Sequence, residues 1–233
     1  LIISAEGLIH LRPEQMEMLR NRLLRHCDRV IVVLCLRNPY HWRVSDVQQR
    51  LKNGATIDRA IETLARPNLY RRLTRRIEQC FGADNLQLLI FEELKAQPAG
   101  LVNGFCDAIG IPRVAAPSPG EDRRNTSMSH RACMVLDRLN ARVPLFLEGR
   151  RNPQRSLTVD RLLRRLPGSR FTLSSEQAGR LREAVETDRR WIRRRLGRDV
   201  WPDELPGIPP LAPEAGRISG WVTTARILGR IIP

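Results

Sequence analysis

The stretch that decides the fold is Val30-Ile-Val-Val-Leu-Cys-Leu36, and Arg37-Asn38-Pro39 follows it directly. A continuous apolar run rich in β-branched residues is typical of a parallel strand that is covered on both faces. Proline cannot donate to a strand ladder, so the strand is predicted to end at the arginine. The sequence therefore predicts one buried strand of a parallel sheet over residues 30–36.

Helical and strand patterns alternate outward from this strand. The strand patterns cover residues 1–4, 30–36 and 86–91, and the helical patterns cover residues 13–24, 39–53, 57–81 with a break at Pro67, and 101–109. Strands that alternate with helices favour an α/β fold, in which a parallel sheet carries flanking helices.

The rest of the chain is predicted to be helical, without further strands. A loop is expected at residues 113–128, and helices at residues 129–142, 158–166 and 174–196. A Pro-rich stretch then leads into a tail. We therefore expect one domain over residues 1–205, with a helical C-terminal part, and a tail over residues 206–233.

The composition indicates an anionic partner. The formal net charge is +15, and basic surfaces attract polyanions. Among the 40 basic residues, however, only Lys52 and Lys95 are lysines, and the arginines are scattered through almost every segment. This strong preference for arginine over lysine reflects genomic base composition as much as function. We therefore expect no specific nucleic-acid binding, and a smaller anion or an acidic polymer is favoured.

Cysteine usage and hydropathy indicate the compartment. The five cysteines form no Cys-x-x-Cys pair, which favours a reducing cytoplasm and no metal site. Cys35 and Cys106 lie in apolar runs and are expected to be small core residues. No apolar run approaches the roughly 18 residues that a bilayer span needs, so no membrane span is expected.

The clearest candidate site joins Arg37 to Ser45, eight residues later. Ligands of parallel sheets bind outside the carboxyl ends of the strands, where Arg37 is expected. Ser45 is expected early in the next helix, whose N-terminus adds a partial positive charge. The three groups together form an anion site. The alternative is an arginine that ends the strand and a solvent-exposed serine.

The strand, Arg37-Asn38-Pro39 and Ser45 resemble the 3′-phosphate-binding motif of sulfotransferases that use 3′-phosphoadenosine 5′-phosphosulfate (PAPS). Residues 85–94 (Asn-Leu-Gln-Leu-Leu-Ile-Phe-Glu-Glu-Leu) and 105–111 (Phe-Cys-Asp-Ala-Ile-Gly-Ile) are similar to later segments of that family. Ser4-Ala5-Glu6, the Asn125-Thr-Ser-Met-Ser stretch and the helix with Trp191 resemble its bacterial members. The resemblance covers roughly residues 1–205.

The resemblance implies a P-loop-like sulfotransferase fold and the transfer of a sulfuryl group from PAPS to a hydroxyl or amine. The acceptor would be a small molecule or a glycan, and no metal would take part. The loop with which the family binds the 5′-phosphosulfate, a Gly-rich turn with a lysine, does not occur in this sequence. Because the sequence opens at Leu1 inside an apolar run, we expect an N-terminal truncation that leaves the chain inactive alone. The alternative is an inactive relative.

Further site residues are candidates within this resemblance. Glu6 would follow the carboxyl end of the strand at residues 1–4 and act as the catalytic base, with His10 as the alternative. Glu6 could equally organise its loop or pair with an arginine. Arg123 and Arg124 are candidates for a second clamp on the 3′-phosphate, although an arginine pair in some loop is expected by chance here.

Two other functions stay open. Net charge alone supports a basic anion-binding module, for nucleic acid or an anionic polysaccharide, without catalysis. A nucleotide-dependent phosphoryl transferase could use the same sheet, but it would need a lysine in a phosphate-binding loop.

Overall fold

The structure is a computed structural model that describes residues 2–115, 127–156, 158, 162–163 and 165–201. The chain divides into Leu1–Asp203 and Glu204–Pro233, and only the first of these contains described residues. The tail expected at residues 206–233 therefore lies outside the described residues, as do residues 159–161 and 164 of the helix expected at residues 158–166.

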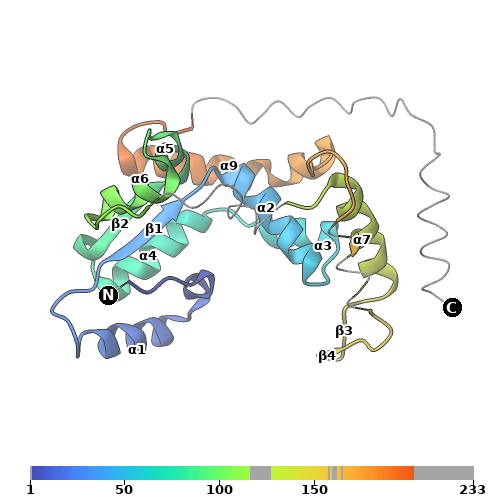
Figure 1. The fold of residues 1–233 in the computed structure, drawn as a ribbon, viewed down its shortest axis with the longest axis horizontal. Coiled ribbons are helices and arrows are strands. Elements are labelled where there is room, and N and C mark those ends of the chain that lie inside the picture. The colour runs from blue at the N-terminus through green and yellow to red at the C-terminus, as the bar shows by residue number, and fades with distance from the viewer. Residues whose placement is uncertain (1, 116–126, 157, 159–161, 164, 202–233) are drawn as a thin grey trace. The chain divides into compact units, whose positions relative to one another are not determined.

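A parallel pair of strands, β1 and β2, forms the sheet beside α4 and α6 (Figure 1). Strands β1 (Val32–Leu36) and β2 (Leu86–Ile90) pair in register from Val32 opposite Leu86 to Leu36 opposite Ile90. Helices α2, α3 and α4 form the crossover between them in the sequence. The α/β class and both strands are thus confirmed, although each strand is shorter than predicted.

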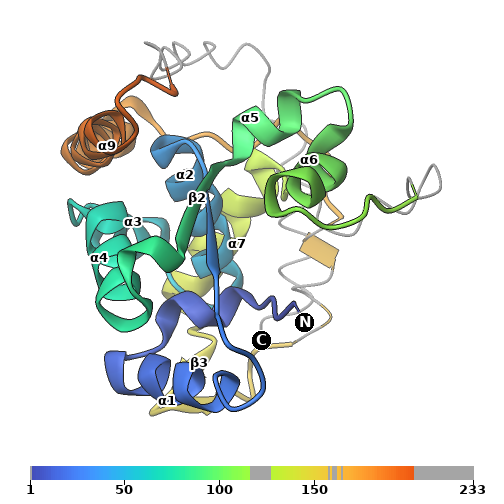
Figure 2. The ribbon, with the colours of Figure 1, turned by 90° about the vertical axis from the view of Figure 1, so that its left-hand side faces the viewer.

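The two faces of the sheet are covered unequally. Leu34, Leu36 and Ile90 are buried in the main core with residues of α1, α4 and α9. On the opposite face Gln87 Nε2 donates to the carbonyl oxygen of Ala108 in α6 at 2.7 Å (Figure 2). Cys35 points to that second face and is exposed, so its prediction as a core residue was wrong. The sequence did not reveal that one face of β1 is buried and the other exposed, because the apolar run places the same residue types on both faces.

The strand expected at residues 1–4 is also absent from the described part of the chain. Residues 2–5 form no strand, and the side chains of Ile2 and Ile3 are 58% and 50% exposed. A strand needs a neighbour for its backbone hydrogen bonds, and no described segment pairs with these residues. The first element is instead a short 3₁₀ helix, η1 (Glu6–His10).

The helices of the first half lie close to their predicted places. They are α1 (Pro13–Leu23), α2 (Pro39–Lys52), α3 (Ile57–Leu64), α4 (Leu69–Phe81), α5 (Phe91–Ala96) and α6 (Gly100–Ile109). A short 3₁₀ helix, η2 (Ala83–Asn85), precedes β2. Only α5 was not predicted as a helix, because its six residues are too few for a periodic pattern.

The second half is helical, as expected, but it also contains a small hairpin. Helix α7 (His130–Arg142) starts at a Ser129 cap, and α9 (Ser175–Leu196) starts at a Ser174 cap with a capping box. Between them, β3 (Phe146–Leu147) and β4 (Arg150–Arg151) form an antiparallel hairpin. The expectation that no strand follows residue 142 was therefore wrong, since two-residue strands leave no alternating pattern to detect.

A buried ion pair fixes α2 against α9 and α4. Arg43 Nη2 lies 2.6 Å from Asp188 Oδ2, and both side chains are almost inaccessible to solvent. The guanidinium also donates to the carbonyl oxygens of Pro39, Leu64 and Ala184. Asp188 Oδ1 accepts the backbone N–H of Tyr70, at the start of α4. The first turns of α2 and α4 are thereby held beside the carboxyl end of β1.

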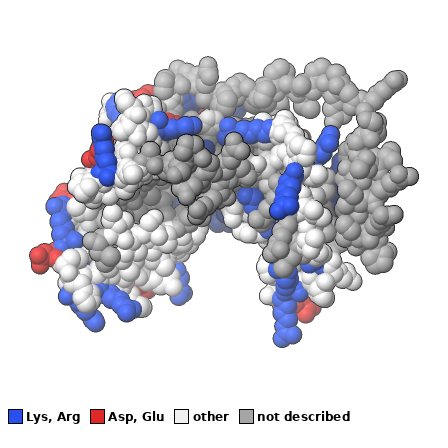
Figure 3. Space-filling model, in the orientation of Figure 1, with Lys and Arg blue, Asp and Glu red and all other residues white. Residues whose placement is uncertain are grey.

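None of the described helices is long and apolar enough to cross a membrane. Basic side chains on the surface in Figure 3 are spread over many elements, as the scatter of arginines in the sequence predicts.

Candidate functional site

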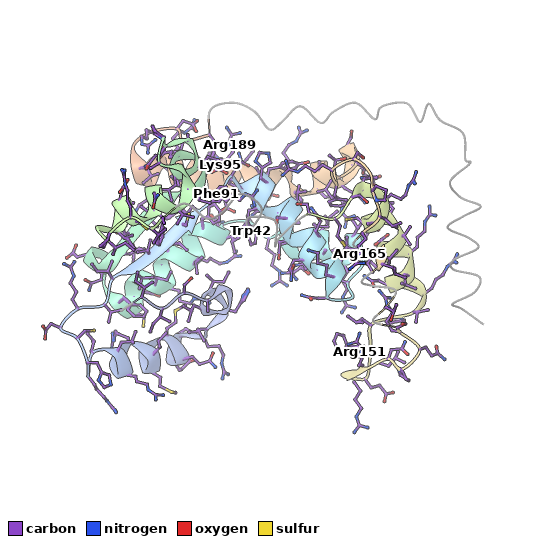
Figure 4. The ribbon with its side chains drawn as sticks, viewed as in Figure 1. Trp42, Phe91, Lys95, Arg151, Arg165 and Arg189 are labelled. Carbon is purple, nitrogen blue, oxygen red and sulfur yellow. The ribbon has the colours of Figure 1, made fainter. Side chains whose placement is uncertain are left out.

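Arg37 lies at the carboxyl edge of the sheet, immediately after β1, and its guanidinium is unpaired. The atom Nε is buried without a hydrogen-bond partner, and no described residue forms a hydrogen bond or ion pair with this side chain. The guanidinium carbon lies 5.1 Å from the ring centroid of Phe91, the first residue of α5. Figure 4 labels Phe91 and, on α2, Trp42. Leaving the donors of a half-buried arginine without hydrogen-bond acceptors costs free energy, unless a ligand supplies those acceptors.

The backbone around Arg37 is fixed from two sides. The hydroxyl of Tyr70 donates to the carbonyl oxygen of Arg37 at 2.5 Å, and burial raises the pKa of Tyr70 so that it stays a neutral donor. On the other side, Glu92 Oε1 accepts the N–H of Asn38 at 2.9 Å. The second oxygen of Glu92 accepts the indole N–H of Trp201, also at 2.9 Å. These contacts hold the turn at the end of β1 in one conformation.

The N-terminus of α2 is already capped from within. Asn38 Oδ1 accepts the backbone N–H groups of Tyr40 and His41 at 3.0 and 3.3 Å, and Pro39 has no N–H. These amides are therefore paired, so the expected contribution of this helix N-terminus to an anion site is limited to its partial positive charge. An anion at this edge would be held mainly by side chains.

Ser45 and His41 lie on one face of α2. They are four residues apart, so their side chains are neighbours on the helix surface, and both are exposed. One turn further, Gln48 Oε1 accepts the backbone N–H of Met128 at 3.1 Å. This face of α2 thus runs from the end of β1 to the segment that precedes α7.

A hollow of about 350 Å³ adjoins that segment. It is lined by residues 127–129 and 166–170, which an isolated β-bridge between Ser129 and Arg170 holds together. Arg170 is exposed, and its positive charge acts on His41. Arg170 therefore lies close enough to His41 for its charge to act on that ring, as the charge of Arg37 also does. Nothing in the sequence distinguished Arg170 from the other arginines, and sequence analysis missed it.

The pKa of His41 depends on the charged residues around it. Partial burial lowers the pKa of His41, and the positive charges of Arg37 and Arg170 lower it further, while Glu92 acts in the opposite direction. A histidine whose pKa is lowered by folding binds a proton less readily in the folded state than in the unfolded state. Its contribution to stability is therefore complete above the ordinary pKa of about 6.5 and is lost as the pH falls below it.

We expect an NMR titration of the His41 ring to give a pKa below the ordinary histidine value, and Arg37→Gln to raise that pKa. The removed charge is one of the causes of the shift. Arg75→Gln, on an exposed position of α4, serves as the control and should leave the titration unchanged. An unchanged pKa in Arg37→Gln would mean that Arg37 and His41 do not share one site.

The remaining predicted residues are not brought to this edge by any described contact. Glu6 begins η1, so it does not follow a strand as expected, and His10 ends the same 3₁₀ helix with an exposed side chain. The carbonyl oxygen of Ile9 accepts from Arg76, six residues after Tyr70 on α4. Arg123 and Arg124 lie outside the described residues.

The site offers cations and hydroxyls and no set of metal ligands. Within the described ranges, no group of three or more His, Cys, Asp or Glu side chains is placed to hold a metal ion. Comparisons of the chain with protein-family models, with curated proteins and with solved structures gave no match.

Proposed function

We propose that this chain binds the 3′-phosphate of PAPS at the carboxyl edge of β1 and belongs to a PAPS-dependent sulfotransferase. The unpaired guanidinium of Arg37 is the observation that carries the proposal. A phosphate dianion would supply the acceptor oxygens that Arg37 lacks, and guanidinium forks bind phosphate in a bidentate manner.

The surrounding residues support the same assignment. Ser45 offers an exposed hydroxyl on the face of α2 that also carries His41, and Arg170 adds a second positive charge that acts on His41. The aromatic ring of Phe91 restrains the guanidinium from one side through a cation–π contact. Arg123 and Arg124 precede Ser127 closely in the sequence, and Ser127 lines the hollow next to Arg170. We include them as candidates for a second clamp.

The reaction of such an enzyme moves a sulfuryl group from the donor phosphate to a hydroxyl or amine of an acceptor. Charge then develops on the leaving bisphosphate, and a base must remove the acceptor proton. Side chains that hold the 3′-phosphate position the donor for this step. Glu6 remains our candidate base, with His10 as the alternative.

The proposal predicts selective binding of adenosine 3′,5′-bisphosphate by the 233-residue chain. At a hundredfold excess of free ligand over its Kd, a ligand of the folded state stabilises by about 2.7 kcal/mol. Thermal or chemical unfolding in the presence of the bisphosphate measures this gain. Adenosine 5′-monophosphate, which lacks the 3′-phosphate, is the matched control and should stabilise much less.

The same assay separates the alternatives. Equal stabilisation by the bisphosphate, by inorganic phosphate and by a short DNA would favour a basic module without nucleotide specificity. Preference for ATP would favour a phosphoryl transferase. Either result would refute the assignment of the 3′-phosphate to Arg37.

A further inference from the structure

The β3–β4 hairpin exposes two large apolar side chains. Its turn, Glu148-Gly149, has positive φ at both residues, 49° and 78°, which matches the tight turn that best continues the twist of two paired strands. Phe146 and Leu147 are 54% and 49% exposed. They are two of the ten large apolar side chains that are exposed on the described surface, and they are adjacent in the chain.

Each face of the hairpin carries one apolar and one cationic residue. Phe146 is opposite Arg151, and Leu147 is opposite Arg150. Because successive side chains of a strand point to opposite faces, the two pairs lie on opposite sides of the hairpin. All four side chains are exposed, so neither face of the hairpin is buried.

The base of the hairpin is firmly held, whereas its tip is free. Leu145 is buried, and its carbonyl oxygen accepts the N–H of Asn152 at 3.0 Å. The side chain of Asn152 donates to the carbonyl oxygen of Pro144, and Arg155 donates to that of Val143, both at 2.9 Å. The fold therefore holds the β3–β4 hairpin in a fixed place. Figure 4 labels Arg151 on it.

The cations of the hairpin are not used inside the protein. No described residue forms a hydrogen bond or ion pair with the side chain of Arg150 or Arg151. The whole chain carries a net charge of +15, so it is attracted to negative surfaces. The hairpin carries two arginines and two apolar residues. This combination matches a surface that has anionic groups on the outside and an apolar layer just beneath them.

We propose that the β3–β4 hairpin docks the protein on an anionic lipid bilayer. Phe146 and Leu147 enter the interfacial region, and Arg150 and Arg151 bind lipid phosphates at the same depth. A protein surface would cover one face of the hairpin and leave the apolar residue of the other face in water. A lipid interface surrounds the hairpin and covers both faces. The proposal is independent of the donor site.

Glu148 at the tip opposes this attraction and so provides a test of opposite sign. Its carboxylate is exposed and has no ion pair with any residue that the structure describes. On an anionic bilayer, Glu148→Gln should therefore strengthen binding, whereas the same change should have no effect if the hairpin stays in water.

The test is co-sedimentation of the full 233-residue chain with vesicles of phosphatidylcholine alone or mixed with phosphatidylserine. The chain should bind the mixed vesicles. Arg150→Gln/Arg151→Gln should weaken that binding by about tenfold or more, since each basic residue at an anionic surface contributes roughly a fivefold factor. Phe146→Ser/Leu147→Ser should weaken it as well, and Glu148→Gln should strengthen it by up to about fivefold.

Control variants remove the same number of positive charges, or one exposed apolar side chain, elsewhere on the surface. Arg71→Gln/Arg75→Gln removes two exposed arginines from α4, and Val102→Ser changes a side chain on α6 that is 52% exposed. Circular dichroism confirms that each variant is folded. The controls should bind the mixed vesicles almost as the unmodified chain does.

Three results would overturn the proposal. The first is no binding to the mixed vesicles. The second is an equal loss in the hairpin and α4 variants, which would reduce the effect to net charge. The third is unchanged vesicle binding together with loss of self-association in the hairpin variants, which would make the hairpin a contact between copies of the chain.

Discussion

Arg37→Ala is expected to weaken the binding of adenosine 3′,5′-bisphosphate by roughly 2–4 kcal/mol, because hydrogen bonds to charged groups contribute about 1.5–3 kcal/mol each. The guanidinium makes no hydrogen bond inside the described protein, so the loss should fall on the ligand and not on the fold. Isothermal titration calorimetry of the bisphosphate measures the change, and chemical unfolding checks that stability is retained.

Ser45→Ala should cost less, about 1 kcal/mol, as the loss of one hydroxyl hydrogen bond does. Both penalties should nearly disappear for adenosine 5′-monophosphate. Arg75→Ala, which removes an exposed arginine of α4, is the control for net charge. If Arg37→Ala weakened both nucleotides equally, or destabilised the protein strongly, Arg37 would hold the fold and the sulfotransferase proposal would lose its main support.

Asp188→Asn is expected to lower the free energy of unfolding by about 3–5 kcal/mol, the usual cost of leaving one partner of a buried ion pair alone. Asparagine keeps an oxygen that can accept the N–H of Tyr70, so the loss isolates the unpaired charge of Arg43. Urea unfolding followed by circular dichroism measures the change.

A matched exposed pair provides the control. Asp58 lies 2.6 Å from Arg180, but its side chain is 71% exposed, and such pairs contribute no more than about 1 kcal/mol. Asp58→Asn should therefore change the stability little. Similar losses in both variants would show that the Arg43–Asp188 pair does not hold α2 and α9 together.

The candidate site was partly visible in the sequence. The position of Arg37 followed from local rules, because a β-branched run that stops at Asn38-Pro39 must end there. Ser45 lies on the next helix, as predicted, but in the middle of α2 and not in its first turn. Tyr70 and Glu92, in contrast, reach the turn after β1 from segments more than 30 residues away, and no local pattern announces such contacts. Arg170 lies farther still along the chain and is one arginine among many.

The incorrect expectations have the same origin. Ile2 and Ile3 form an apolar run of the kind found in strands, but pairing requires a neighbour that local sequence does not supply. Cys35 belongs to an apolar run, yet the coverage of its face depends on how α6 packs. The caps of α2 show the same dependence: Asn38 binds the first amides itself, which removes them from any ligand.

The sequence by itself determined the α/β class, the two parallel strands, most helix boundaries and the place of Arg37, because each depends on the residue types of one short segment. Only the tertiary structure decided which side chains lie near Arg37, that its guanidinium has no hydrogen-bond or ion-pair partner among the described residues, and that the hairpin is exposed on both faces. Those properties depend on contacts between segments distant in the chain, and the free energy of such contacts arises from burial and pairing that exist only after folding.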